Sequence, residues 1–137
     1  MRTIKLKIIT PNKIALEREV YSVSAPTESG EITILPGHMG LFTLLIEGIV
    51  KIKTTTSEDF LSIGGGYLQT NGDQVNVLVS SAYGQTEIDQ KQTEDAVNEA
   101  KKIINQTKDV NERAEATAIL RRSIVDLKLL KKRKRPV

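Results

Sequence analysis

The sequence predicts a β-sandwich of about ten short, mostly antiparallel strands over residues 1–84, followed by an antiparallel α-helical hairpin over residues 85–137. Two observations predict this fold class. Up to about Tyr83, apolar residues recur at every second position between frequent turn residues, which is typical of short, half-buried strands. After Gly84 there is no further glycine, and no proline before Pro136, while Ala, Glu, Lys and Gln accumulate as they do in helices.

The strand pattern begins with Ile4, Leu6 and Ile8, and it returns in residues 32–34, 50–53 and 75–79. Turn signals separate these runs: Thr10-Pro11-Asn12, Pro36-Gly37-His38, Gly64-Gly65-Gly66 and Asn71-Gly72-Asp73. Because Asn-Gly tolerates the positive φ angles of a tight hairpin, we expect residues 67–70 and 74–79 to pair antiparallel.

The three consecutive glycines, 64–66, separate two strands. A phosphate-binding loop would need a Gly-Lys-Ser/Thr ending, and a dinucleotide loop would have to open a helix. Neither follows here. The glycines therefore predict a bulge or a close backbone contact.

The helical half begins with Asp89, which can cap a helix with Gln92 in the capping-box position. Two apolar stripes at helical spacing follow, with the polar residues 105–111 between them. The first stripe is Ala96, Val97, Ala100, Ile103 and Ile104, and the second is Ala116, Leu120, Ile124, Leu127 and Leu130. Both stripes are narrow and rich in alanine, so we expect weak docking and a hairpin able to detach.

The composition excludes several kinds of functional site. The chain has no cysteine, which excludes disulfides, thiolate metal sites and a cysteine nucleophile. Its start lacks the pattern of a secretory signal, and its most apolar stretch, residues 40–46, is too short to span a membrane, so we expect any membrane association to be peripheral. Residues 112–135 hold nine basic and three acidic residues, a net charge of +6, whereas the remainder carries −3. This uneven distribution of charge predicts an acidic partner for the C-terminal end.

His38 is the only histidine, and no second His or nearby acid supports catalysis or metal binding, so we interpret it as a turn residue held for structure or contact. The run 131–135 fits either a nucleic-acid or anionic-surface patch or a solvated end, although aromatic residues for base stacking are scarce. Arg121 and Arg122, with Arg113 and Lys128, form a basic band on the second helix. This band is either a solvated face or a docking site for a partner's carboxylates.

Taken together, these residues resemble the epsilon subunit of the F-type ATP synthase. The resemblance covers almost the whole chain, and its most specific part is the Gly-Glu…Leu-Pro-Gly-His run. The segments that carry it are Ile8-Ile9-Thr10-Pro11, Val20 through Pro26, Gly30 through His38, and Gly64-Gly65-Gly66-Tyr67-Leu68.

This resemblance implies a ten-stranded sandwich and two helices without a catalytic site or cofactor. It implies binding to the gamma subunit and to the polar loops of the membrane rotor ring (the c subunits). In this family the helices also extend toward the alpha and beta subunits, where basic residues block ATP hydrolysis. By this match, Glu31 and His38 would meet the rotor loops, and Arg113, Arg121, Arg122 and Lys128 would lie on the inhibitory helix.

Two positions depart from the family pattern. Members that bind regulatory ATP have an arginine where this chain has Gln92, so we expect no ATP sensing. Met39-Gly40 stands where many members have Ala-Pro, which frees the backbone beside His38.

The resemblance predicts a peripheral subunit on the cytoplasmic side of a cell inner or plasma membrane, with the stromal side of a thylakoid as the second possibility. The competing hypothesis is a small nucleic-acid-binding β-domain with a basic helical tail. An enzyme is a distant third, because no acid-base pair or nucleophile is assembled in the sequence.

Overall fold

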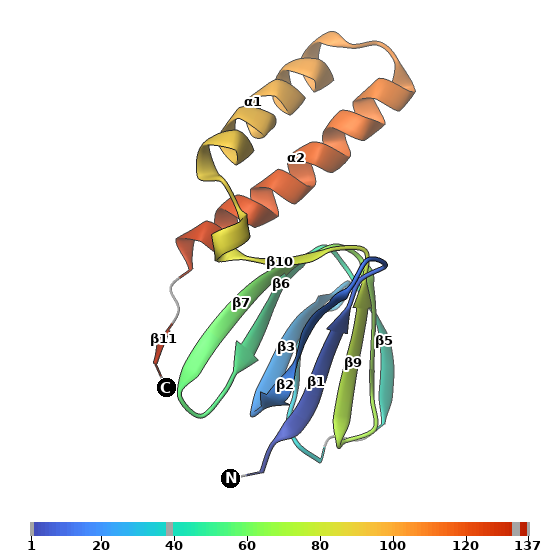
Figure 1. The fold of residues 1–137 in the computed structure, drawn as a ribbon. Helices are drawn as coiled ribbons and strands as arrows, with labels where there is room; N and C mark the ends of the chain where they lie inside the picture. The colour runs from blue at the N-terminus through green and yellow to red at the C-terminus, as the bar shows by residue number, and fades with distance from the viewer. Residues whose placement is uncertain (1, 38–39, 133–134, 137) are drawn as a thin grey trace.

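The computed structural model describes residues 2–37, 40–132 and 135–136. Within them, ten strands form two facing sheets, β1 to β10 in chain order, and two helices follow (Figure 1). The predicted fold class, a β-sandwich followed by a helical hairpin, is confirmed.

The first sheet has five strands in the order β2-β1-β9-β8-β5. Their neighbours are antiparallel except for β1 and β9, which run parallel. The strands are β1 (Ile4–Ile9), β2 (Ile14–Val20), β5 (Leu41–Leu45), β8 (Gly66–Thr70) and β9 (Gln74–Val79).

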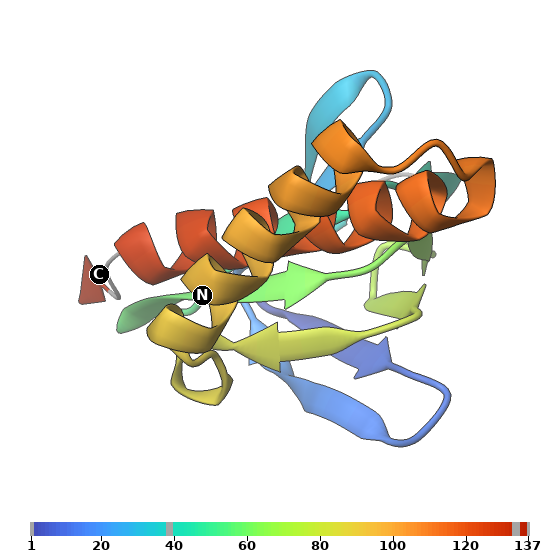
Figure 2. The ribbon, with the colours of Figure 1, turned by 90° about the horizontal axis from the view of Figure 1, so that it is seen from above.

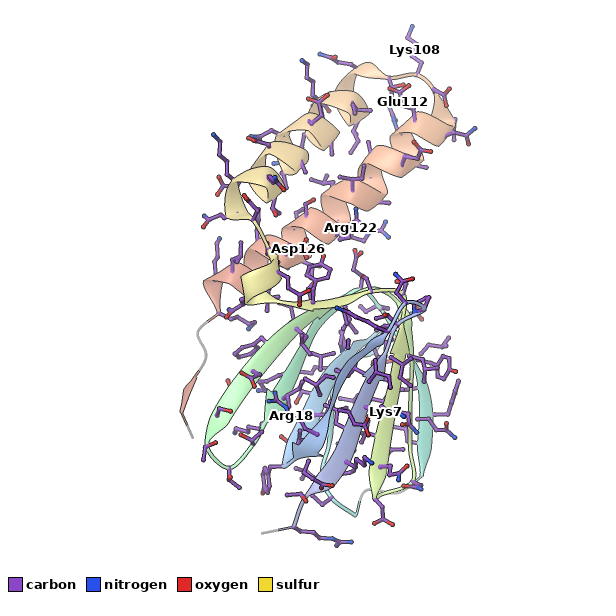
Figure 3. The ribbon with its side chains drawn as sticks, viewed as in Figure 1. Lys7, Arg18, Lys108, Glu112, Arg122 and Asp126 are labelled. Carbon is purple, nitrogen blue, oxygen red and sulfur yellow. The ribbon has the colours of Figure 1, made fainter. Side chains whose placement is uncertain are left out.

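The second sheet has the order β10-β7-β6-β3-β4, and each neighbouring pair is antiparallel. A further short strand, β11, returns from the C-terminal end and pairs with residues 57–58 of β7. The strands are β3 (Ser22–Thr27), β4 (Gly30–Ile34), β6 (Gly48–Lys53), β7 (Ser57–Ile63), β10 (Ala82–Gly84) and β11 (Arg135–Pro136). Arg18 of β2 pairs with Asp59 of β7 at 2.5 Å and links the two sheets (Figure 3).

The hydrophobic core lies between the sheets. Ile4, Leu6 and Ile8 are fully buried, as the alternation in the first strand predicts, while Lys5 and Lys7 point outward. All sixteen residues of the core cluster lie between positions 4 and 82, so the sandwich fills its own interior without the helices.

The hairpin between β8 and β9 has the predicted antiparallel pairing. Gly72 has a φ of 96°, but within the described residues no residue other than glycine has a positive φ. Asn71 therefore does not adopt the positive φ that an Asn-Gly turn tolerates. Its side chain instead accepts hydrogen bonds from the backbone N–H groups of Asp73 and Gln74, which closes the turn.

Gly84 ends the strands, and a single 3-10 turn, η1 (Gln85–Glu87), leads to the helices α1 (Gln90–Gln106) and α2 (Val110–Lys131). Asp89 caps α1 as predicted, by accepting from the backbone N–H of Gln92. The connection between the helices is shorter than the polar segment 105–111, because both helices extend into it. Asp109 caps α2, and its carboxylate accepts from the N–H groups of Asn111 and Glu112.

The predicted apolar stripe of α2 is correct except at Ile124, which is 39 % exposed. Ser123 is buried in its place, and Leu129, which lies outside the stripe, is also buried. The physical reason is that α2 packs against α1 on one side and against β6 and β7 on another, so its buried positions do not form one stripe.

The hairpin stands at one end of the sandwich. α2 runs past the edge of the second sheet, while α1 packs along α2 (Figure 1). Seen from above, the two helices lie side by side, and the turn between β3 and β4 projects beyond them (Figure 2). Across the described part of the chain, no helix is both long and apolar enough to cross a membrane.

Candidate functional site

Glu31 lies on β4, the outermost strand of the second sheet. It is exposed and points away from the core, because Ile32 and Ile34 point inward and side chains alternate along a strand. His38, the second predicted rotor contact, lies outside the described residues.

The turn that leads to His38 is supported by another turn. The N–H of Gly37 donates to the carbonyl of Gly72, at 3.0 Å, in the β8–β9 hairpin. Gly37 has a φ of 82°, which favours glycine, and a Cβ there would lie 3.0 Å from the guanidinium of Arg2. The turn before His38 is thus braced by backbone from another strand pair.

An apolar row crosses the outer face of the first sheet. Four register pairs join its members across neighbouring strands. From β5 to β2 these pairs are Leu44–Tyr67, Tyr67–Leu78, Leu78–Ile9 and Ile9–Ile14. These five residues, one from each strand, are called the apolar row below. Their chain neighbours Leu45, Leu68, Val77, Val79 and Ile8 are core residues, so the row faces outward.

The two ends of the apolar row are exposed, and Ile9, Tyr67 and Leu78 between them are half-buried. Leu44 is 69 % and Ile14 52 % exposed. Phe42, which is 61 % exposed, lies two residues before Leu44 on the same face of β5, with its ring centroid 5.1 Å from that of Tyr67. A shallow pocket of about 390 Å³ beside Tyr67 is lined by Ile9, Pro11 and Leu78.

The adjacent row on the same face is polar apart from Phe42, which is the register partner of Gln69. Gln69, Asn76 and Lys7 are register partners across β8, β9 and β1 (Figure 3). An exposed apolar strip with a polar border is typical of a protein–protein contact. The outer face of the first sheet can therefore bind a partner surface that is itself apolar along one line.

The four predicted basic residues of α2 are all exposed, but they do not form one band. At about 100° per residue, Arg113, Arg121 and Lys128 fall within about 80° of one another around the helix, whereas Arg122 lies on another side. Arg113 also donates to the carbonyl of Thr107, which ties the start of α2 to the connection between the helices. Arg122 instead lines a cavity that faces the sandwich.

This cavity has a volume of about 560 Å³ and lies between the hairpin and the sandwich. Its lining includes two basic residues, Lys13 and Arg122, and three acidic ones, Glu87, Asp89 and Asp126. Gln92, where the family's ATP-binding members carry arginine, also lines it. With more acids than bases, this lining disfavours a polyphosphate, and within the described residues no cluster of side chains suits a metal ion.

Asp126 joins the hairpin to the sandwich at the edge of the cavity. Its Oδ1 accepts from the hydroxyl of Tyr83, at 2.6 Å, and from the hydroxyl of Ser62, at 2.9 Å. Burial, and then the hydrogen bond to Asp126, raise the pKa of Tyr83 to about 12, so its phenol keeps the proton that it donates.

Sequence reasoning missed both the apolar row and the contact of Asp126. A signal existed for the row, because Phe42, Leu44, Tyr67 and Leu78 occupy the outward positions of otherwise alternating strands. Asp126 carried no such signal, since its partners lie 43 and 64 residues away.

Comparison with known proteins gives the family. Residues 3–85 match the model of the ATP synthase delta/epsilon chain β-sandwich domain. The chain is 33 % identical over 129 residues to the ATP synthase epsilon chain of Moorella thermoacetica, covering 93 % of this chain and 96 % of that one. It is also 33 % identical over 109 residues to the epsilon chain of Priestia megaterium, covering 80 % and 81 % of the two chains.

Solved structures agree on the fold. A chain of the Euglena gracilis mitochondrial ATP synthase, in a structure of OSCP, F1 and the c-ring, superposes with a TM-score of 0.71 at 23 % identity, covering 94 % of this chain and 78 % of that one. A chain of the Tetrahymena thermophila mitochondrial ATP synthase, in a structure of the central stalk and c-ring, gives 0.67 at 16 % identity, covering 95 % and 98 %. With the sandwich, the helical hairpin and the sequence matches in agreement, the chain belongs to the family of ATP synthase epsilon chains.

Proposed function

We propose that this chain is a non-catalytic subunit of a proton-translocating F-type ATP synthase, which couples the gamma subunit to the membrane rotor ring and inhibits ATP hydrolysis through its helices. Family membership supports the assignment to this complex. The similar chains from Euglena gracilis and Tetrahymena thermophila come from structures that include the c-ring, which supports a rotor position.

The apolar row is the observation that carries the coupling role. It is an exposed apolar strip over all five strands of a sheet whose other face is the core. A rigid sheet gives such a strip a fixed shape, and burying it against gamma would release apolar surface from water. We therefore assign gamma to the outer face of the first sheet.

The rotor ring is assigned to the region of Glu31 and His38. Support comes from the braced Pro36-Gly37 turn and from the exposure of Glu31 on an edge strand. Polar ring loops suit a carboxylate and a turn better than they suit the apolar row.

Inhibition is assigned to the exposed basic residues of α2. Arg113, Arg121 and Lys128 share one side of the helix, where they can meet carboxylates of the alpha and beta subunits when the hairpin extends. Arg122 is also exposed but lines the cavity beside the sandwich, so a partner could approach it from more sides once the hairpin leaves. The helical half, residues 85–137, is thus proposed as the regulatory unit, and residues 1–84 as the coupling unit.

No cofactor and no nucleic acid belong to this proposal. The location that follows is peripheral, on the cytoplasmic side of a bacterial inner or plasma membrane, because the relatives include bacterial epsilon chains.

Gamma binding tests the coupling role. We expect the double variant Phe42→Ser/Leu44→Ser to bind gamma at least about tenfold more weakly, since each buried apolar side chain contributes about 1.5–3 kcal/mol. The matched control is Val110→Ser, because Val110 is 81 % exposed and lies on α2, away from the apolar row. Equal gamma affinity for the double variant and the control, measured by titration, would remove the assignment of this face.

ATP hydrolysis by the reconstituted enzyme tests the inhibitory role. The triple variant Arg113→Ala/Arg121→Ala/Lys128→Ala should raise the hydrolysis rate. The control Lys101→Ala/Lys102→Ala/Lys108→Ala removes the same charge from exposed positions elsewhere in the hairpin. If both variants hydrolyse ATP at the wild-type rate, the inhibitory role is wrong.

A further inference from the structure

The hairpin is fastened to the sandwich at one end only. Hydrogen bonds from Ser62, Tyr83 and Gln85 reach the C-terminal end of α2, between Asp126 and Lys132. Figure 3 shows Asp126 at the end of α2 nearest the sandwich and Lys108 and Glu112 at the opposite tip. The position of the tip relative to the sandwich therefore depends on the contacts at the other end of α2.

Asp126 is the centre of this fastening. The two hydroxyl donors come from different strands, Ser62 from β7 and Tyr83 from β10, and both reach the same carboxylate oxygen. Ser62 is only 2 % exposed, so little water can reach its hydroxyl and take the place of Asp126 as the acceptor. Hydrogen bonds to an ionised acceptor are among the stronger ones in proteins.

Two weaker contacts lie next to Asp126. The side-chain amide of Gln85 donates to the carbonyl of Leu129, at 2.7 Å, and also to that of Lys132, which satisfies carbonyl groups at the end of α2. The ammonium of Lys132 lies 5.2 Å from the centre of the Phe60 ring. Neither contact holds a charged group as closely as the pair of hydroxyls holds Asp126.

The rest of the hairpin is loosely seated. The cavity of about 560 Å³ separates it from the β1–β2 turn, and Ile119, on the cavity wall, is 39 % exposed. α1 makes its main contacts with α2 and not with the sheets. Little apolar burial would therefore resist movement of the hairpin once the end of α2 is released.

We propose that Asp126 is a latch: its carboxylate, held by Ser62 and Tyr83, sets the balance between the docked hairpin and a released one. In the docked state Arg122, one turn before Asp126, faces the cavity. Release separates Arg122, which is already exposed, from the sandwich residues that line the cavity with it, so an acidic partner could approach it from that side as well. The biological meaning of the latch rests on the proposed inhibitory role, but its existence is a property of the isolated chain.

The test measures a distance in the intact chain. Because the sequence has no cysteine, the pair Glu28→Cys/Asn111→Cys carries spin labels at only these two positions, one in the β3–β4 turn and one at the tip of the hairpin. Both side chains are exposed and neither contacts the latch. We expect one main distance for the parent chain. In Asp126→Ala, the released population should rise about tenfold or more.

The control is Glu115→Ala, which removes one exposed carboxylate from the same helix. Asp126→Asn keeps an acceptor oxygen and should lie between the parent and Asp126→Ala. Unchanged distances in Asp126→Ala, or an equal change in Glu115→Ala, would refute the latch.

Two further variants guard against misfolding. Ser62→Ala and Tyr83→Phe each remove one donor, and each should release the hairpin less than Asp126→Ala does. Amide exchange in β1 and β9 must stay as slow as in the parent, which shows that the sandwich is folded. If Asp126→Ala releases the hairpin but leaves ATP hydrolysis by the complex unchanged, the latch stands and the inhibitory role falls.

Discussion

Gly66 lies where β8 makes its closest backbone approach to β9. A Cβ built on it would lie 1.9 Å from the carbonyl oxygen of Leu78, which is backbone and has little freedom to move. Gly66→Ala should therefore lower the free energy of unfolding by about 3 kcal/mol, the upper part of the range for overpacking. In urea unfolding, this loss of stability should appear as a lower midpoint with an unchanged slope.

Gly65 provides the neighbouring control. Its Cβ would lie 3.6 Å from the nearest atom, the carbonyl oxygen of Leu45, which is ordinary contact. Gly65→Ala should stay within about 1 kcal/mol of the parent. Equal losses at both positions would mean that the close approach is not what requires glycine.

The raised pKa of Tyr83 predicts that the stability of the fold decreases at alkaline pH. Its pKa is raised from 10.0 to about 12 by burial and by Asp126, while the hydrogen bond of Ser62 and the charge of Arg122 act in the opposite direction. The folded pKa exceeds the unfolded one, so the stabilisation by the neutral phenol is fully present below pH 10. It is lost as the pH rises through about 12.

The comparison with Tyr83→Phe isolates this effect. Other groups titrate in both chains, so only the phenol of Tyr83 distinguishes them. Between pH 10 and 12 the parent should therefore lose stability faster than the variant. Tyrosinate absorbance should show one late-titrating phenol in the parent and none in Tyr83→Phe. Parallel stability curves for the two chains would contradict the role of the phenol.

Single residues also mark the limit of sequence reasoning. The burial of Ile4, Leu6 and Ile8 was predictable, since alternation depends only on near neighbours along the chain. Asp126 was not, because its role is created by Ser62 and Tyr83 from distant strands. The roles of Glu31 and His38 come from family resemblance and stay predictions.

Helix α2 shows the same limit in an element. Its existence and most of its apolar stripe follow from the spacing of residues, but the burial of Ser123 and Leu129 depends on a second packing surface that spacing does not reveal. The start of α2 was also misplaced. Lys108, Asp109 and Asn111 are all polar, and only the structure identifies Asp109 as the cap.

That cap yields a prediction for the helix. Asp109→Ala removes the acceptor of two backbone N–H groups and should destabilise the start of α2 by about 1 kcal/mol. Amide exchange at Asn111 and Glu112 should then be about fivefold faster, whereas Asp109→Asn, which keeps the acceptor, should resemble the parent. Equal exchange in all three chains would show that the tip frays regardless of its cap.

The apolar row exists only through the register of five strands. Each strand taken alone presents only one or two outward apolar residues, and β1 joins β9 in parallel although their starts lie 70 positions apart in the sequence. Sequence patterns predict which face a residue occupies, but not which residues of distant strands lie side by side. The sequence could therefore indicate the outward apolar residues, but not that they form one surface, which depends on the sheet order.

The division of the whole chain into two units predicts that the sandwich folds alone. Every residue of the core cluster lies before Gly84, and the buried residues of the helices, among them Ala100, Ala116 and Leu129, lie outside that cluster. A chain ending at Gly84 should unfold cooperatively in urea, with amide protection in β1 and β9 like that of the full chain. Its stability should fall modestly, because Ser62 and Tyr83 lose the carboxylate of Asp126 and β7 loses its pairing with β11.

The truncated chain also separates the two proposed roles within the complex. It keeps the apolar row and should bind gamma as the full chain does, yet it lacks α2 and should leave ATP hydrolysis uninhibited. A parallel chain with Phe42→Ser/Leu44→Ser in the truncated background should fold but lose gamma. If the truncated chain fails to fold, the helices contribute to the sandwich itself, and a hairpin that swings free at low cost becomes untenable.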